Sequence, residues 1–287
     1  MQFRRVSPRG LRLALRNVLL GLVGLVALFV ALVRVGLVPD PFGASISGDL
    51  ALARSDRPGL RVLFVGNSLT YRNGMPSLVR RLALADPAPR RVFVVQYTKP
   101  GGQLTRAEHD DRLTRLLREI HWNVVVLQEQ SEIPSLPSAE RRKLMDGPVR
   151  DLVWLAGSSG AQTWLFDTWG YRSGDRGRVD GDSYAAMQVR LDLGYRDVAA
   201  ETGAVVIPVG DAWAEAVRLR PGLALWAGDG KHPTKLGSYL TACVFYEFLT
   251  HRRAPSYVPS GVSGADGALL REAAAAIAER EGALRAN

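Results

Sequence analysis

The sequence contains a single cysteine, Cys243, among its 287 residues. An intramolecular disulfide is therefore excluded, and the redox compartment cannot be deduced from cysteine usage. The mostly apolar neighbours of Cys243 predict a small buried residue on a helix rather than a reactive thiol. A hydrophobic content of 47% is enough for a proper core, and the length allows one large domain or two small ones.

The sequence also lacks an evenly spread basic charge. Its formal net charge is +9, but six arginines in or beside the first apolar segment carry most of that excess, and +3 remains without them. The rest of the chain has no strong electrostatic attraction for nucleic acid and contains no nucleic-acid-binding motif. We therefore expect no nucleic-acid partner. The six residues are Arg4, Arg5, Arg9, Arg12, Arg16 and Arg34.

Charge is absent from residues 18–33, and after Arg34 the apolar run continues to residue 38. At about 1.5 Å per residue, the segment 18–38 can span a hydrocarbon core of about 30 Å, with Arg34 reaching the far interface. The basic segment 1–17 predicts a cytoplasmic amino terminus. We expect an uncleaved transmembrane anchor, the membrane as a partner and an extracytoplasmic catalytic domain. The alternative is a cleaved signal peptide and a secreted protein, although no clean Ala-x-Ala site follows.

Three common kinds of functional motif are missing. The chain has no Gly-x-Ser-x-Gly, which argues against an ordinary α/β-hydrolase. Gly66-Asn67-Ser68 is not followed by the Gly-Lys-Ser/Thr of a phosphate-binding loop. Histidine and cysteine nowhere show metal-ligand spacing, so we predict neither a metal nor a cofactor.

The chain from residue 39 onward divides by composition into three parts. We predict a Gly/Ser/Pro-rich linker over 39–59, a catalytic domain over 60–252 and a C-terminal segment, 253–287, with an alanine-rich helix. Apolar runs alternate with amphipathic stretches in the domain, which predicts a three-layer α/β/α fold with one parallel sheet. The expected strands cover 61–66, 91–97, 122–128, 161–167 and 204–209; the expected helices cover 75–85, 104–120, 138–156, 183–201, 212–219, 234–249 and 265–283.

Residues suited to ligand binding lie at the ends of three of these strands. Ser68 comes just after the first strand, Gly102 after the second and Gln128 at the end of the third. Ligands bind at the carboxyl ends of strands in open α/β sheets. A serine there supplies a hydroxyl, and a glycine lets a backbone N–H approach a ligand closely.

A late turn carries Asp229-Gly230-Lys231-His232. An aspartate three residues before a histidine can fold back onto one ring nitrogen, leaving the other nitrogen to accept a proton from a serine hydroxyl. Nucleophilic acyl transfer needs this arrangement. The same residues also suit an ordinary Asp-Gly turn before a helix, with Pro233 near its start.

Together these blocks resemble the SGNH hydrolases, also called GDSL-like esterases and lipases, over residues 61–249. Gly66-Asn67-Ser68-Leu69 resembles the family's first block, and Asp229-Gly230-Lys231-His232 matches its last. The resemblance implies a flavodoxin-like five-stranded parallel sheet, Ser68 as nucleophile, Asp229 and His232 as its partners, and the Ser68 and Gly102 N–H groups in the oxyanion hole. It is closest to a bacterial subgroup with Leu-Gln-Glu-Gln-Ser as third block.

The third block departs from the usual Gly-x-Asn-Asp of this family. A glutamine amide can donate the hydrogen bond that the asparagine would supply. Position at the strand end favours Gln128, whereas register with the family block favours Gln130. Both remain candidates for the oxyanion hole.

We therefore expect a serine esterase that cleaves a short acyl or acetyl ester, with a glycan as one candidate carrier. Asn67, Trp169 and Trp226 are the expected substrate contacts, the tryptophans as a sugar-stacking wall. The glycine-rich loop 170–182 is expected to overhang the site. The alternatives are an acyltransferase with the same triad and a non-catalytic glycan-binding protein that keeps the fold.

Overall fold

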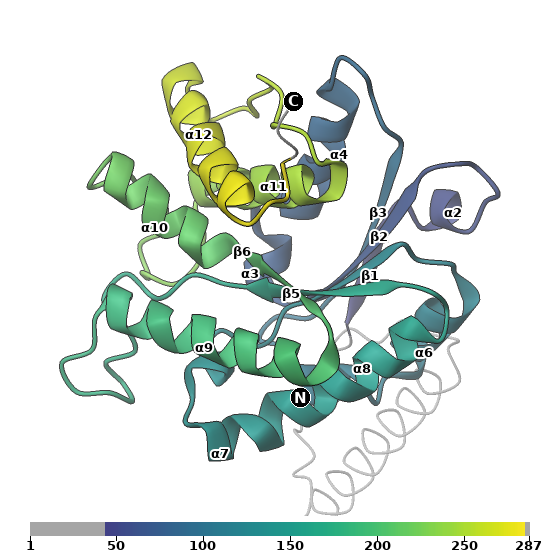
Figure 1. Ribbon diagram of the computed structural model, residues 1–287, viewed down its shortest axis with the longest axis horizontal. Coiled ribbons are helices and arrows are strands. Elements are labelled where there is room, and N and C mark those ends of the chain that lie inside the picture. The colour runs from purple at the N-terminus through teal and green to yellow at the C-terminus, as the bar shows by residue number, and fades with distance from the viewer. Residues whose placement is uncertain (1–43, 285–287) are drawn as a thin grey trace, which may run out of the picture. The chain divides into compact units, whose positions relative to one another are not determined.

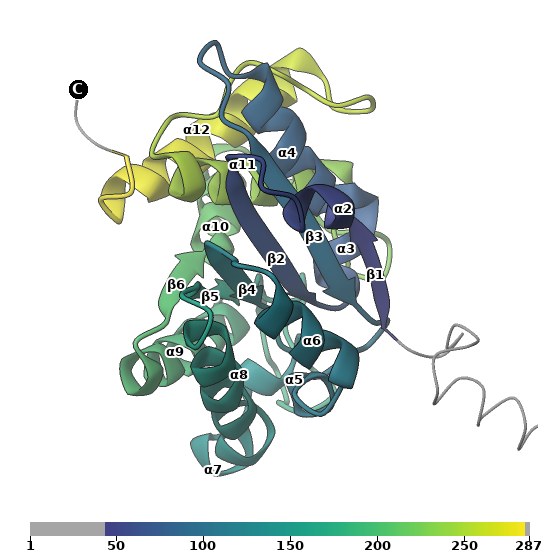
Figure 2. The same cartoon turned by 90° about the vertical axis from the view of Figure 1, so that its right-hand side faces the viewer.

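Valine-rich apolar runs form the central sheet of the computed structural model, which describes residues 44–284 (Figure 1). Because most side chains on both faces of the five parallel strands are buried, these runs are mostly apolar rather than alternating. Within the described residues the sheet has six strands in the order β1-β3-β2-β4-β5-β6 (Figure 2). They are β1 (Ser45–Gly48), β2 (Leu60–Gly66), β3 (Val92–Thr98), β4 (Val124–Leu127), β5 (Gln162–Asp167) and β6 (Val205–Pro208).

The edge strand β1 corrects two predictions. It pairs antiparallel with β3, so the sheet is mixed rather than wholly parallel, although the five predicted strands are parallel to one another. Its residues and the short helix α2 (Leu50–Ala53) lie inside the segment that was expected to be a linker. Asp49 fixes the turn between them, because its carboxylate accepts a hydrogen bond from the Val94 N–H at 3.1 Å and pairs with Arg80 at 3.0 Å.

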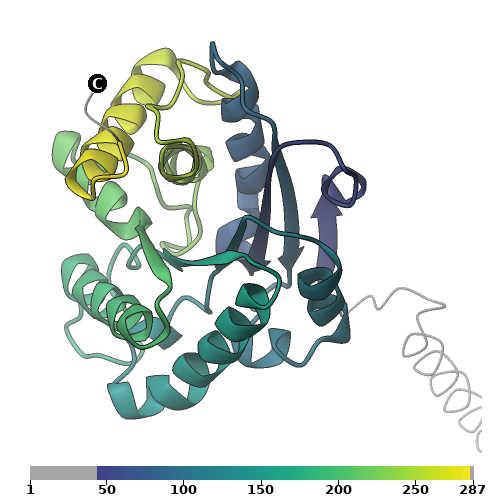
Figure 3. The same ribbon diagram turned by 45° about the vertical axis from the view of Figure 1, so that its right-hand side comes forward.

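Helices cover both faces of the sheet, as Figure 3 shows with the strands seen nearly edge-on. One layer contains α4, α10, α11 and α12, and the other contains α5 to α9. The bounds are α4 (Met75–Ala85), α5 (Leu104–Ala107), α6 (Asp111–Glu119), α7 (Ser138–Arg141), α8 (Gly147–Gly157), α9 (Tyr184–Thr202), α10 (Val209–Leu219), α11 (Lys235–Thr250) and α12 (Gly264–Arg280). Single turns α3 (Ser68–Tyr71), η1 (Arg72–Gly74) and η2 (Ile133–Ser135) follow β2 and β4, and a π-helical turn, η3 (Arg142–Asp146), joins α7 to α8.

Two predicted helices are interrupted. The expected helix over 104–120 is α5 followed by α6, because the Asp110 side chain accepts from the Arg112 N–H and caps a new helix. The expected helix over 138–156 contains a π-helical turn before Pro148 at the start of α8. Apolar periodicity does not detect such breaks, because the buried face continues across them.

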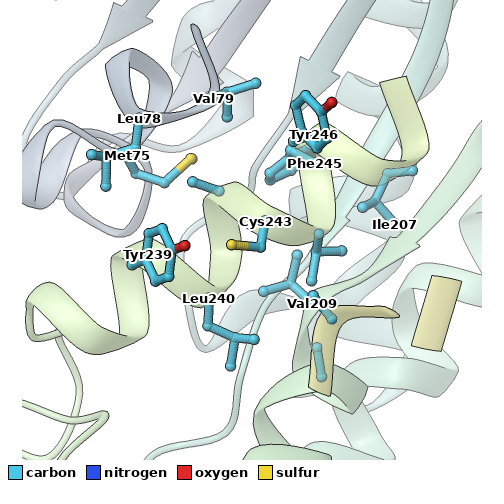
Figure 4. Packing of buried hydrophobic residues seen from close by; sticks show 14 of the residues in the cluster. Met75, Leu78, Val79, Ile207, Val209, Tyr239, Leu240, Cys243, Phe245 and Tyr246 are labelled. Carbon is cyan, nitrogen blue, oxygen red and sulfur yellow. The ribbon is translucent and has the colours of Figure 1, made fainter. Parts of the chain in front are cut away.

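Helix α11 is the centre of the hydrophobic core on its side of the sheet (Figure 4). All residues from Gly237 to Thr250 are buried. The Phe245 ring packs edge-on against the rings of Phe64 and Phe166, with ring centroids 5.1 and 4.9 Å apart. Cys243 is fully buried among them, as predicted, and burial raises the pKa of its thiol. The alanine-rich helix α12 packs on α11 through buried alanines, so the C-terminal segment belongs to the same core.

The predicted membrane anchor, residues 18–38, lies outside the described residues. Between residues 44 and 284, no helix is both long and apolar enough to cross a membrane.

Two leucines on α4 provide a test of this core. Leu82 is fully buried in the layer that α4 forms with α11, whereas Leu84 on the same helix is 55% exposed. We expect Leu82→Ala to lower the free energy of unfolding by about 2–5 kcal/mol, because it leaves a cavity. Leu84→Ala should change it by less than about 0.5 kcal/mol. Urea denaturation followed by circular dichroism measures both, and equal losses would contradict the packing described.

Candidate active site

Three neighbouring strand ends form one edge of the site. Strand β2 lies between β3 and β4, so the segments that follow these three strands meet at the carboxyl edge of the sheet. A cavity of about 400 Å³ opens there. Its lining combines the predicted nucleophile and base with residues from all three segments: Asn67, Ser68, Leu69, Tyr71, Arg72, Pro100, Gly101, Gln130, Ser131, Glu132, Tyr171, Lys231 and His232.

Asn67 delivers Ser68 to this cavity. Its backbone is extended, its side-chain oxygen accepts from the Leu69 N–H at 3.1 Å, and Ser68 becomes the first residue of α3. Its amide nitrogen donates to the Gly102 carbonyl at 3.0 Å. Asn67 is buried and these bonds are internal, so its described contacts are those of a helix cap rather than those of a substrate ligand.

Gly66 is required immediately before this turn. A Cβ atom at Gly66 would lie 2.5 Å from Thr70 Oγ1 and 2.7 Å from Gln128 Oε1. These two side chains are hydrogen-bonded to each other at 2.9 Å beneath the turn. The glycine therefore allows the buried polar floor to approach the strand end closely.

The late turn brings a histidine to the serine. Ser68 Oγ lies 2.9 Å from His232 Nε2, and His232 Nδ1 lies 2.6 Å from Asp229 Oδ2. The other Asp229 oxygen accepts from the N–H groups of Lys231 and His232 at 2.9 and 3.0 Å. Gly230 turns the chain with φ +68, in the left-handed region that glycine adopts readily. The three predicted residues are thus hydrogen-bonded in series.

The hydrogen bonds also set the charge of Asp229. Partial burial raises its pKa, but the bonds from the Lys231 N–H, the His232 ring and the His232 N–H outweigh burial and hold the pKa well below its ordinary value. Asp229 is therefore ionised at neutral pH. An ionised carboxylate on Nδ1 keeps the proton there and leaves Nε2 free to accept one from Ser68.

The two tryptophans do not line the cavity. Trp169 is buried and stacks on Trp213 with ring centroids 3.9 Å apart, and Trp226 packs edge-on against Trp213. Trp169 Nε1 donates to the Lys231 carbonyl at 2.9 Å, and Trp226 Nε1 donates to the Gly170 carbonyl at 3.0 Å. The predicted sugar-stacking wall is therefore wrong in this structure: Trp169 holds the backbone of the histidine turn, and Trp226 holds the start of the loop 170–182.

The two candidate glutamines occupy different environments. Gln128 is buried; its oxygen accepts from the Asn67 N–H at 2.9 Å and its nitrogen donates to the Glu129 carbonyl. Gln130 lines the cavity, and its oxygen accepts from the Glu132 N–H at 2.9 Å. Its amide nitrogen has no partner among residues 44–284. Of the two candidates, Gln130 therefore borders the cavity, and Gln128 belongs to the buried floor beneath it.

The glycine that faces the cavity is Gly101 rather than Gly102. The Gly102 N–H donates to the Lys99 carbonyl at 2.9 Å, so it is engaged within its own turn. Gly101 has φ +60 and lines the cavity. In the described part of the chain, neither the Gly101 N–H nor the Ser68 N–H has a hydrogen-bond acceptor.

Several cavity residues gave no signal in the sequence. The Tyr171 hydroxyl lies 2.7 Å from Ser131 Oγ and donates to Glu132 Oε1 at 2.9 Å. Lys231 Nζ lies 4.3 Å from the centre of the Tyr171 ring. The glycine-rich loop 170–182 contributes a second cavity of about 680 Å³, which shares Glu132, Tyr171 and Lys231 with the first. The loop therefore extends the lining of the site on one side. Over residues 44–284, no three His, Cys, Asp or Glu side chains are grouped so as to hold a metal.

Glu129 is a buried carboxyl beneath the site. Its oxygens accept from the Gln130 N–H at 2.6 Å and from the Leu104 N–H at 3.2 and 3.3 Å. Burial raises its pKa to about 8, although these two hydrogen bonds oppose the shift. Glu129 therefore joins the segments after β3 and β4 while carrying a proton through much of the neutral range.

Comparison with known structures shows the family and the fold of the chain. No family model and no curated protein matches the sequence. Among solved structures, a candidate SGNH hydrolase from Slackia heliotrinireducens is 30% identical, with 66% of this chain and 98% of that chain covered and a TM-score of 0.55. A DUF4886 family protein from Bacteroides uniformis is 19% identical, with 78% and 96% covered and a TM-score of 0.66, which shows a shared fold.

The raised pKa of Glu129 predicts a pH-dependent stability. Its protonated form is favoured in the folded chain, so its contribution is complete below the ordinary pKa of 4.5 and is lost as the pH rises to about 8. The loss is up to about 1.4 kcal/mol per pH unit in that window. Glu129→Gln cannot ionise, so its unfolding free energy should rise relative to wild type between pH 5 and pH 8.

Urea denaturation at both pH values measures this difference. Glu140→Gln, an exposed position on α7, is the matched control and should follow wild type. Parallel pH curves for Glu129→Gln and wild type would contradict the prediction.

Proposed function

We propose a serine-esterase mechanism for this chain, which belongs to the SGNH hydrolase family of ester hydrolases. The observation that carries the proposal is the series Asp229 Oδ2 to His232 Nδ1 at 2.6 Å and His232 Nε2 to Ser68 Oγ at 2.9 Å. This separation is within hydrogen-bond reach for a base and its nucleophile. The substrate class, the acyl-enzyme and the roles of individual residues belong to the proposal.

In the acylation step, His232 Nε2 accepts the proton of the Ser68 hydroxyl while Oγ bonds to the ester carbonyl carbon. The tetrahedral intermediate then collapses: the bond to the alcohol oxygen breaks, and His232 returns the proton to that oxygen. Asp229 stabilises the imidazolium between these transfers. The products are a free alcohol and an acyl group bonded to Ser68.

The negative charge on the former carbonyl oxygen needs donors that are already in place. The Ser68 N–H, the Gly101 N–H and the Gln130 amide all border the cavity and have no partner within residues 44–284. We assign these three groups to the oxyanion hole. Gly101 thus takes the place that the family resemblance implied for Gly102, and of the two candidate glutamines we assign Gln130.

Deacylation repeats these steps with water. His232 removes a proton from a water molecule, the hydroxide bonds to the acyl carbon, and the bond to Ser68 Oγ breaks as His232 returns the proton to the serine. A carboxylic acid leaves and the enzyme is restored. A second alcohol in place of water would give acyl transfer by the same residues.

The cavity lining favours a short acyl group on a polar alcohol. Most of its side chains are polar or charged, and the apolar contributions come from Leu69 and Pro100 with the two tyrosine rings, Tyr71 and Tyr171. A long fatty chain would need an extended apolar surface. Hydroxyl-rich alcohols such as glycans suit the tyrosines and the hydrogen-bonding groups of this lining.

The triad is tested with 4-nitrophenyl acetate. Ser68→Ala and His232→Ala should each lower kcat by about 10⁴–10⁶-fold, and Asp229→Asn by about 10⁴-fold, because proton transfer and nucleophilic attack are lost. A fluorophosphonate should label wild type but not Ser68→Ala. Circular dichroism checks that each variant is folded, and unchanged activity in a folded Ser68→Ala would refute the mechanism.

The assignment of the oxyanion donor is tested separately. Gln130→Ala should lower kcat by about 10²–10³-fold without altering the unfolding free energy greatly. Gln128→Ala should instead reduce stability, because it leaves the Asn67 N–H and Thr70 hydroxyl beneath the turn without their acceptor. Comparing kcat with denaturation midpoints distinguishes the two, and the reverse pattern would assign Gln128 to the hole.

We further propose that residues 18–38 anchor the enzyme in a membrane, with the catalytic domain on the extracytoplasmic side. The arginines before this apolar segment support that orientation. A chain tagged at its amino terminus should keep the tag and sediment with membranes after alkaline washing. Loss of the tag from the mature protein would indicate a cleaved signal peptide instead.

A further inference from the structure

Arg72 is the one cation of the catalytic cavity whose side chain has no partner among residues 44–284. It is exposed, lines the same cavity as Ser68 and His232, and lies four residues after the nucleophile. The cavity's other cation, Lys231, pairs with Glu132 at 3.4 Å and lies over the Tyr171 ring. Glu132 is further balanced by Arg178 at 3.6 Å. The guanidinium of Arg72 is therefore available to a ligand.

The backbone beneath Arg72 is fixed against the histidine turn. The Arg72 carbonyl accepts from Ser238 Oγ at 3.3 Å. The next residue, Asn73, adopts φ 53 and donates through its side chain to the Pro233 carbonyl at 3.1 Å and to Ser238 Oγ at 2.9 Å. Asparagine tolerates this left-handed conformation, which the three contacts maintain. The backbone at Arg72 is thus tied to the segment that directly follows His232.

The residues that line the two cavities carry an excess of positive charge, to which Arg72 contributes. The catalytic cavity and the neighbouring loop cavity are lined by four arginine or lysine residues and only two carboxylates. A concave surface lined mainly by one sign of charge attracts ligands of the other sign. The cations are Arg72, Lys231, Arg176 and Arg178, and the carboxylates are Glu132 and Asp175.

The chemistry places the alcohol portion of the substrate on this side. The departing alcohol oxygen must approach His232 Nε2 to receive its proton, whereas the carbonyl oxygen points to the donors at Ser68, Gly101 and Gln130. Arg72 is anchored through Asn73 to the residue that follows His232. A group carried by the alcohol therefore reaches Arg72 more readily than one carried by the acyl chain.

We infer that Arg72 forms an anion subsite, and that the substrate is an ester whose alcohol portion bears a carboxylate, as in an O-acylated acidic sugar. A single guanidinium presents two parallel N–H groups that match the two oxygens of a carboxylate. Lysine, a point charge, reproduces the attraction but not this paired geometry. The inference rests on the proposed esterase function and specifies its substrate class.

The full-length chain is assayed with two acetate esters of the same shape, 4-acetoxybenzoate and the neutral 4-acetoxybenzamide. Wild type should prefer the carboxylate in kcat/KM, and Arg72→Gln should lower the ratio of the two values about tenfold or more, mainly through KM. Arg72→Lys should restore part of the ratio. Added salt should reduce the preference of wild type.

Arg81→Gln is the matched control, because it removes the same charge from an exposed position on α4 that does not line the cavity. Its substrate ratio should equal that of wild type. An equal loss on both esters in Arg72→Gln, or no preference in wild type, would overturn the anion subsite. A larger effect on mono-4-nitrophenyl succinate, which carries its carboxylate on the acyl side, would overturn its placement.

The two proposals fail in different ways. If wild type hydrolyses neither acetate and Ser68 is not labelled by a fluorophosphonate, the esterase function is wrong. If wild type is labelled and hydrolyses both esters with the same kcat/KM, only the anion subsite is wrong.

Discussion

The hydrogen bonds of the Asp229 carboxylate are the constraint on which the site depends. One oxygen is held by two backbone N–H groups of its own turn and the other orients the His232 ring, so the base is positioned by four consecutive residues. The sheet then has only to bring Ser68 to that ring. The stacked tryptophan Trp169 extends the constraint into the core, because it holds the Lys231 carbonyl from beneath.

Local patterns explain why much of the fold and the triad could be predicted. Strands β2 and β4 are continuous buried apolar runs, and Asp229 and His232 interact within one turn. Strand β1 could not be predicted, because it has only four residues and half of them are polar. It pairs with β3, which lies about fifty residues later in the chain. The pairing with β3 stabilises this strand, and the propensities of its own residues do not reveal that pairing.

The residues that face the cavity after β3 and β4 could not be predicted from the sequence for a related reason. Gly101 and Gly102, like Gln128 and Gln130, differ by one or two positions, and the face that each presents depends on how the chain turns after its strand. Tertiary hydrogen bonds decide the outcome: Gly102 is engaged by Lys99, and Gln128 by Asn67. The residues turned inward form a rigid polar floor, and the remaining ones stay open toward the cavity, which is the preorganisation that catalysis requires.

The distance along the chain between Ser68 and His232 has a consequence for synthesis. The nucleophile leaves the ribosome 164 residues before its base, and α11, which follows the base directly, has its apolar surface covered by α12 from the end of the chain. Domains fold as units once their long-range contacts are available. A nascent chain that stops before His232 therefore carries Ser68 without its histidine partner, and the order of the elements delays the assembly of the site until α12 has been made.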